Sequence, residues 1–424
     1  MAIKAGQILH DINGYVIDRI QSAGPGNLNI PQEKIYELGN YNTVATIYDI
    51  PDLSFDLESF DMTTEFECVL TGEDPLTFSS TVGSNEIDFA DAVPIDVVSP
   101  FKSRKGAYDI VKGIAVPYLT LERVTYRFGL RQNAAQTFTL RGDSIYYIPG
   151  QPYYQEFNNT GVGPYNFTNT ALVYSEGADN VHALCVTLYD STTKAYKRCF
   201  FDSTATTGYY YSDTSSGFTL ADDFSADYDT IRVVYGSATL GSYTQLGNNP
   251  SGHAVHVANV SVKPAAVRPK DIDVYVSDGA ATPTWTRLTG VQSAELTRSV
   301  NLENDEEFGN AHYVSQEYDT ADVSGSIGFK PTDPSDLMAK LYNITKGSDD
   351  GEIIGPNLTL PVGLEIHVNH PDTGARLKTL YVEDARFSVP GMQGRVQQKL
   401  ETSLAFSSDG GNIKVYNGKR ISSL

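Results

Sequence analysis

The chain has 424 residues, and its 52 acidic side chains outnumber the 31 lysines and arginines, which gives a formal net charge of −21. A surface this acidic repels phosphate at long range, which argues against a protein that grips DNA or an anionic membrane. Only 20% of the residues are charged, and 27 Tyr, 18 Phe and 36 Gly accompany a single Trp. This composition is typical of an all-β protein with many turns rather than of a disordered acidic tail.

The N-terminal residues lack the basic start and apolar core of a signal peptide, and no apolar run approaches the length of a membrane span. We therefore expect synthesis in a cytoplasm and no contact with a membrane. The three cysteines match neither a disulfide framework nor a zinc pattern. Cys185 and Cys199 flank a predicted turn and are interpreted as reduced residues of a strand pair.

Residues 1–149 are predicted to form a first β unit. Alternation of apolar and polar residues predicts strands at 53–57, 116–128 and 136–141. Between the first two, Thr64 and Glu67 predict a capping box for a short helix that ends at Gly72.

Residues 150–268 are predicted to form an inserted β-sandwich domain, rich in Tyr, Thr, Ser, Gly and Asn. Its clearest predicted strands are 183–189, 196–201 and 230–235, and the proline-rich stretch 263–269 is interpreted as its exit linker. Its tyrosines are interpreted as covering a sheet, with a sugar-stacking face as the alternative. They are Tyr153, Tyr154, Tyr165, Tyr209, Tyr210 and Tyr211.

Residues 269–424 are predicted to form a second β unit. Asp333 and Pro334 predict the start of a helix with an apolar stripe, and Gly347 predicts its end. Alternating segments then predict strands at 364–368, 379–387 and 400–406.

An internal repeat relates the two β units. At one constant offset, which brings position 37 onto position 307, seven of eighteen positions are identical without a gap. The pairs are Glu37/Glu307, Gly39/Gly309, Asn40/Asn310, Tyr48/Tyr318, Asp49/Asp319, Asp52/Asp322 and Ser54/Ser324. Upstream, residues 20–23 (IQSA) match residues 291–294 (VQSA) after a slip of one residue. These residues are interpreted as a structural signature rather than as a catalytic site.

The second copy resembles the major tail proteins, or tail tube proteins, of tailed bacteriophages. In that family an early strand with a similar VQSA phrase leads into a long hairpin with an acidic, glycine-containing turn, then a second strand, one helix and a closing hairpin. The corresponding segments are 291–294, 303–310, 323–326 and 336–344. The resemblance covers residues 272–418 and, through the repeat, residues 10–145. It implies two tail-tube-like antiparallel β-barrel or sandwich domains, each with one short α-helix, around the inserted β-sandwich.

The resemblance also implies an assembly. Tail tube proteins form rings of six domains that stack into a hollow tube, so a chain with two such domains would close a pseudo-hexameric ring as a homotrimer. The implied partners are other copies of the chain and the tape measure, tail terminator and baseplate proteins of the virion. Genomic DNA would pass through at ejection without specific binding, and the insert would decorate the exterior. The protein would reside in the virion tail after assembly in the host cytoplasm.

The acidic cluster Glu303, Asp305 and Glu306 is expected to line the bore or to contact the next ring, with solvation of a loop as the alternative. Carboxylates in a bore would repel phosphate and let DNA slide.

Other functions have weaker support in the sequence. No nucleophile elbow, phosphate-binding loop or dinucleotide motif is found, so we expect no enzyme activity and no cofactor. The pairs His253/His256 and His367/His370 lack a third ligand at a suitable spacing, so no metal site is expected. The alternative hypotheses are another ring-forming tail component, such as a terminator, distal-tail or baseplate protein, and a carbohydrate-binding surface protein.

Overall fold

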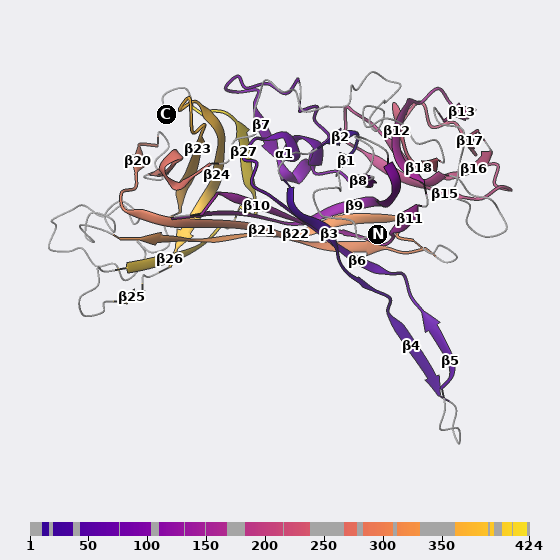
Figure 1. The fold of residues 1–424 in the computed structure, drawn as a ribbon, viewed down its shortest axis with the longest axis horizontal. Helices are drawn as coiled ribbons and strands as arrows, with labels where there is room; N and C mark the ends of the chain where they lie inside the picture. Colours follow the sequence, from indigo (N-terminus) through magenta and orange to yellow (C-terminus); the bar gives the residue numbers. More distant parts are fainter. Residues whose placement is uncertain are drawn as a thin grey trace.

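The computed structural model of the protein describes residues 11–16, 20–36, 43–75, 77–102, 110–130, 132–148, 150–167, 183–214, 216–237, 267–277, 283–307, 312–330, 361–388, 391–393, 401–408 and 410–421. The chain is mainly β, as its composition predicts. Its strands form a large sheet of 18 strands, a sheet of seven strands and a two-stranded hairpin (Figure 1). The described helices are α1 (Glu65–Leu70) and the 3-10 turns η2 (Phe89–Asp91) and η5 (Pro269–Asp271).

The first third of the chain contributes eleven strands. They are β1 (Asp11–Ile12), β2 (Tyr15–Val16), β3 (Ile20–Asn29), β4 (Gln32–Tyr36), β5 (Thr43–Tyr48), β6 (Asp52–Ser59), β7 (Glu86–Asp88), β8 (Ile95–Lys102), β9 (Ile110–Gly129), β10 (Ala135–Gly142) and β11 (Tyr146–Ile148). The long strand β9 belongs to two layers. Its N-terminal part pairs with β8 and β11, and its C-terminal part pairs with β10, which continues through β6 to β3.

The last third of the chain repeats this topology. Its strands are β19 (Ile272–Ser277), β20 (Trp285–Arg287), β21 (Val291–Asp305), β22 (Ser315–Phe329), β23 (Val362–Asn369), β24 (Arg376–Phe387), β25 (Gly391–Gln393), β26 (Glu401–Ser408) and β27 (Ile413–Asn417). The strand β24 pairs with β23 and β27 near its start and with β26 near its end, and β26 continues through β22 to β21. Each of these pairings has its counterpart around β9.

The backbone register also repeats with the offset found in the sequence. Gln32 lies opposite Tyr48 in the first copy, and Leu302 lies opposite Tyr318 in the second, at that same offset. The slip of one residue is a β-bulge in β3, where the register shifts between Pro25 and Asn27. The two hairpins therefore pair in the same way apart from one inserted residue.

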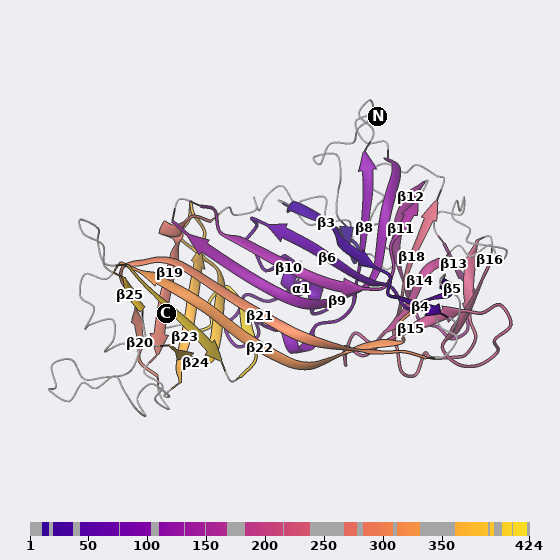
Figure 2. The same ribbon diagram turned by 90° about the horizontal axis from the view of Figure 1, so that it is seen from below.

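Two prolines in the first copy give its hairpin a different shape from that of the second copy. In the second copy β21 and β22 run as one continuous ribbon (Figure 2). In the first copy the same course is interrupted at Pro31 and Pro51, where the missing N–H groups end the ladder. The backbone N–H of Asp49 donates to the carbonyl of Pro31 at 3.1 Å across this bend. The hairpin β4–β5 consequently projects away from the body as an arm (Figure 1).

The two copies differ at one pair of neighbouring positions in the sheet. Phe55 on β6 lies opposite Leu140 on β10, whereas the equivalent pair in the second copy is Gly325 and Phe406. A Cβ atom on Gly325 would lie 2.4 Å from the Phe406 ring. The phenylalanine ring is therefore supplied by β6 in the first copy and by β26 in the second.

The seven-stranded sheet lies between the two copies in sequence, in the order β12-β18-β14-β15-β16-β17-β13. Its strands are β12 (Gln151–Asn158), β13 (Tyr165–Asn166), β14 (Ala183–Tyr189), β15 (Tyr196–Phe201), β16 (Tyr210–Thr214), β17 (Gly217–Leu220) and β18 (Thr230–Ser237). The strands predicted at 183–189 and 196–201 are confirmed. Cys185 and Cys199 are buried free thiols on these strands.

The sugar-stacking alternative is wrong for four of the six predicted tyrosines. Tyr153, Tyr154, Tyr165 and Tyr211 are buried with relative exposures of 5% or less. Tyr153 stacks on Tyr235 with 5.4 Å between ring centroids, and Tyr165 stacks on Phe218 at 5.2 Å. Burial of large aromatic surface in the core explains the tyrosine content of these strands.

The helix α1 packs into the core that the two copies share. Phe66 meets Phe138 edge to face, with ring centroids 4.3 Å apart. The predicted end is confirmed, because Gly72 follows the helix with φ of +71°. The predicted capping box is wrong, since Thr64 makes no capping hydrogen bond with its side chain and Glu67 is buried. The helix predicted after Asp333 lies outside the described residues.

A buried carboxyl at β1 gives the fold a pH-dependent stability. Asp11 is 1% exposed and accepts a hydrogen bond from the Gly14 N–H at 2.8 Å, while burial raises its pKa to about 7. Because this pKa lies above that of the unfolded chain, the stabilising contribution is complete below about pH 4 and is lost as the pH rises through 7.

Asp11→Asn keeps the acceptor oxygen and removes the charge. We expect the free energy of unfolding to rise by about 2–4 kcal/mol at pH 8, since one pKa unit corresponds to about 1.4 kcal/mol, and to change little at pH 4. Urea denaturation at both pH values measures the difference. An equal effect at the two values would contradict the buried, protonated state.

Candidate assembly interface

The central part of the large sheet joins the two copies edge to edge. Its strands follow the order β3-β6-β10-β9-β21-β22-β26, and the eighth position is shared by the end of β24 and by β25, which both pair with β26. Each copy thus supplies four of the eight positions. The two sets meet where β9 pairs antiparallel with β21, a contact that we call the internal seam (Figure 2). The sheet thus consists of two equivalent halves related by the internal repeat.

The internal seam is held by backbone pairing and by contacts on both faces. Its register places Tyr126 opposite Leu296, and both side chains are buried in the core. On the other face the hydroxyls of Thr125 and Thr297 lie 3.2 Å apart. Two pairs further on, on the same face, Arg127 Nε is 3.4 Å from Glu295 Oε1, with both side chains about half exposed. An ion pair at this exposure contributes little energy but favours one register.

One face of the eight-stranded sheet is apolar and the other is polar. The apolar face packs against α1 and the remaining strands, which lie above it in Figure 1. The polar face carries alternate residues with hydroxyl and charged side chains joined across the strands. Its contacts include Thr139 to Asp56 at 2.8 Å and Arg141 to Asp52 at 3.3 Å and to Glu122 at 3.4 Å. No described element covers this polar face.

The sheet ends in two open edges. In the described part of the chain, β3 pairs with β6 alone and β25 pairs with β26 alone. An edge strand presents a row of unpaired N–H and C=O groups, which can accept another strand. The two edges lie at opposite ends of the eight-stranded sheet.

The repeat signature lies on the paired hairpins. Asp52 and Ser54 begin β6, and Asp322 and Ser324 occupy the equivalent positions on β22. Tyr318, equivalent to Tyr48 on β5, lies on β22, and burial raises its pKa above the usual range. Asp49 and Asp319 follow these tyrosines, and Glu307 is exposed. Glu37, Gly39, Asn40, Gly309 and Asn310 lie outside the described residues.

The acidic cluster predicted to line a bore or to contact the next ring lies at the end of the β21–β22 hairpin that extends beyond β9. Glu303 and Asp305 are exposed near the end of β21, beyond its pairing with β9, and Glu306 follows them. This end of the hairpin is fixed to its surroundings. The Tyr313 N–H donates to Asp143 Oδ2 at 3.0 Å, and the Tyr196 hydroxyl donates to the carbonyl of Gln316 at 3.1 Å.

Two buried charge networks were not predicted from the sequence. Lys378 of β24 and Glu67 of α1 form an ion pair that is completely buried, and the hydroxyl of Tyr126 donates to the same carboxylate at 2.8 Å. Arg198 of β15 pairs with Asp143 at 2.7 Å, also buried. The partners in these pairs are 311 and 55 residues apart, and no local pattern links them.

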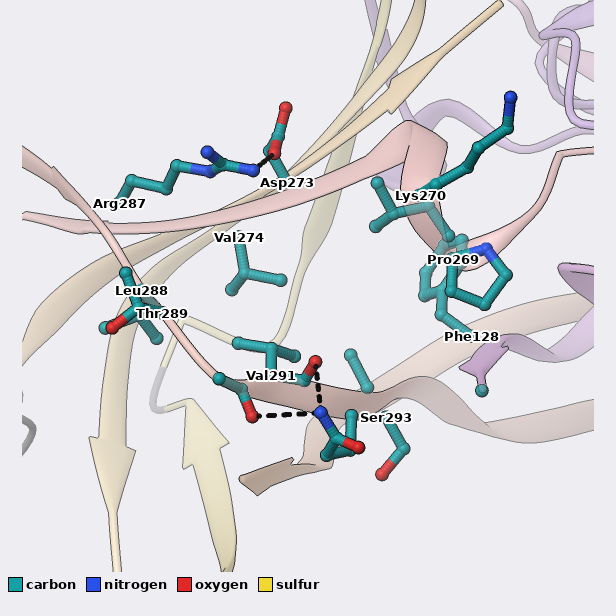
Figure 3. Close-up of a pocket in the computed structure, with 15 residues that line it drawn as sticks. Phe128, Pro269, Lys270, Asp273, Val274, Arg287, Leu288, Thr289, Val291 and Ser293 are labelled. Atoms are coloured by element: carbon teal, nitrogen blue, oxygen red, sulfur yellow. Dashed lines mark hydrogen bonds and ion pairs between the residues drawn. The ribbon is translucent and has the colours of Figure 1, made fainter. Parts of the chain in front are cut away.

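A pocket of about 310 Å³ lies at one end of the internal seam, beside Phe128 and Ser293 (Figure 3). Its charged groups do not converge. Arg287 pairs with Asp273, and Lys270 points away from the pocket. Among the described residues no three His, Cys, Asp or Glu side chains are placed to hold a metal ion. The open sheet edges are therefore the stronger candidate for a functional surface.

Comparison with known proteins identifies no family. No protein family matches the sequence, and no curated protein matches it. A solved structure of the anti-feeding prophage baseplate, sixfold symmetrised, contains a matching chain that is 12% identical, with a TM-score of 0.25. The match covers 34% of this chain and 92% of that chain. The two structures share too little for this match to define a fold or a function. In the described ranges no helix is long and apolar enough to cross a membrane.

Proposed function

We propose that the protein is a structural subunit of the tail tube of a tailed phage. Three copies close a pseudo-hexameric ring, and rings stack head to tail into a hollow conduit for DNA. The observation that carries this proposal is the eight-stranded sheet of two equivalent halves with an open edge at each end. Edges of this kind are satisfied when they pair with the next copy, and a head-to-tail contact that closes forms a ring.

The polar face of the sheet suits the wall of the conduit. Its hydroxyl groups are neutral, and two of its arginines, Arg127 and Arg141, are held in ion pairs with carboxylates, whereas Arg123 on the same face is exposed. Cations that are already paired offer less attraction to passing phosphates than free ones. The seven-stranded sheet lies beside the eight-stranded sheet and not across its polar face, which leaves the conduit open (Figures 1 and 2).

In this proposal the partners are further copies of the chain and the tape measure, terminator and baseplate proteins of the virion. The protein acts without catalysis and without a cofactor. It takes its place in the virion tail after assembly in the host cytoplasm.

Negative-stain microscopy and light scattering of the purified full chain test the proposal. We expect hollow tubes, or trimeric rings that stack as the concentration rises. Single rings that never stack would favour a terminator, distal-tail or baseplate protein. Monomers that persist at high concentration would overturn the assembly altogether.

A further inference from the structure

We infer that β25 of one copy pairs with β3 of the next copy in the register that β9 and β21 adopt at the internal seam. This inference rests on the proposed function, because it takes a second copy of the chain as the partner. It goes further by naming the residue pairs of the contact between chains.

The strand β25 is the counterpart of the C-terminal part of β9. In the first copy Thr137, Gln136 and Ala135 of β10 lie opposite Thr125, Tyr126 and Arg127. In the second copy Ser403, Thr402 and Glu401 of β26 lie opposite Gly391, Met392 and Gln393. The sequence offset between the two copies is the same for both members of each pair. The outer edge of β25 is therefore equivalent to the edge of β9 that receives β21.

The strand β3 is the counterpart of β21. Gly24 lies opposite Asp56, as Glu295 lies opposite Ser326. The same comparison holds on both sides of the bulge in β3. Pro25 is equivalent to Leu296, and Asn27 is equivalent to Thr297. The outer edge of β3 is therefore equivalent to the edge of β21 that pairs with β9.

Transfer of the internal register to the two open edges defines the contact. Arg127 opposite Glu295 becomes Gln393 opposite Gly24. By the same transfer, Tyr126 opposite Leu296 becomes Met392 opposite Pro25, and Thr125 opposite Thr297 becomes Gly391 opposite Asn27. Met392 and Pro25 are apolar residue types, as are the residues of the equivalent pair in the internal seam.

The two seams differ in charge. The ion pair of the internal seam is replaced by an uncharged pair, Gln393 and Gly24, between chains. Backbone hydrogen bonds and apolar contact then carry the contact between copies. The paired residues of this contact should consequently add little salt dependence to ring formation, since screening acts on charges.

Cysteine cross-linking tests the register. Directly opposite residues of an antiparallel pair have Cα atoms about 4.5–5.5 Å apart, within reach of a disulfide. A Cβ atom on Gly24 meets nothing within 4 Å, and the native Cys68, Cys185 and Cys199 are buried. We expect oxidised Gly24→Cys/Gln393→Cys protein to form a covalent ladder that ends at three chains. The pair Asn27→Cys/Gly391→Cys provides an independent second test.

The matched control is Asn29→Cys/Gln393→Cys, in which Asn29 lies several residues from the predicted partner on the same edge strand. It should assemble but give at least tenfold less cross-linked product. Circular dichroism of the reduced proteins verifies that each variant folds. Rings that cross-link through the control and through neither predicted pair would overturn the register and leave the proposed function intact. Folded variants that stay monomeric and uncross-linked would overturn both.

Discussion

Replacement of Lys378 by Met is expected to lower the free energy of unfolding by about 3–5 kcal/mol, because it leaves a carboxylate buried without its cation. The Lys378 and Glu67 side chains have no solvent exposure. The ammonium group also donates to Gln136 Oε1 at 2.9 Å, while Glu67 Oε2 has no hydrogen-bond partner even in the intact network. Chemical denaturation at neutral pH measures the loss.

Two further variants test whether the loss of stability arises because the ion pair is buried. Lys414 pairs with Glu86 at 2.9 Å near the surface, so Lys414→Met should cost about 1 kcal/mol or less. The double variant Lys378→Met/Glu67→Gln removes both charges and should recover most of the stability. If Lys378→Met were no more harmful than Lys414→Met, the buried pair would not join α1 to β24 as described.

Arg198→Met is expected to have a loss of similar size, about 3–5 kcal/mol at pH 7, for the same reason. Asp143 is buried, and burial alone would raise its pKa; the Arg198 guanidinium and His312 outweigh burial and hold the pKa of Asp143 below its usual range. This depressed pKa contributes stability that is present above about pH 4 and is lost as the pH falls further. Removal of Arg198 removes the largest single attraction, that of the guanidinium charge.

The pH dependence distinguishes this effect from a packing defect. In Arg198→Met the Asp143 carboxyl can be neutralised by a proton, so the deficit relative to the natural chain should shrink between pH 7 and pH 4. Urea denaturation at both values measures it, with Arg198→Lys as the variant that keeps the charge. A deficit that does not change with pH would assign the effect to lost packing around Tyr118, over which the guanidinium lies at 5.0 Å.

Local patterns predicted the strands well because each strand has its own alternation or apolar run. The segment 183–189 is buried along its whole length and is bounded by turn residues, so its ends could be predicted. The capping box failed for a tertiary reason. Glu67 has the spacing of a capping residue, yet the buried Lys378, 311 residues away, pairs with its carboxylate.

The acidic cluster is a second case in which tertiary structure decides what a local pattern cannot. Its carboxylates were expected in a bore, at a ring contact or solvated on a loop, and Glu303, Asp305 and Glu306 are exposed, the first two on β21. Their distance from the polar face of the eight-stranded sheet depends on how far β21 extends beyond β9, which is a matter of strand pairing. Their place in a bore or a ring contact stays a prediction.

By itself the sequence determined that the chain is mainly β and that one hairpin recurs at a constant offset, because turns, alternation and repeated residues are local properties. Only the tertiary structure decided that the two copies pair edge to edge through β9 and β21, that one arm projects while the other hairpin end is anchored, and that two open edges remain in the described sheet. The reason is physical: backbone hydrogen bonds between strands do not depend on side-chain identity. Which edge meets which is therefore settled by the packing of the whole core.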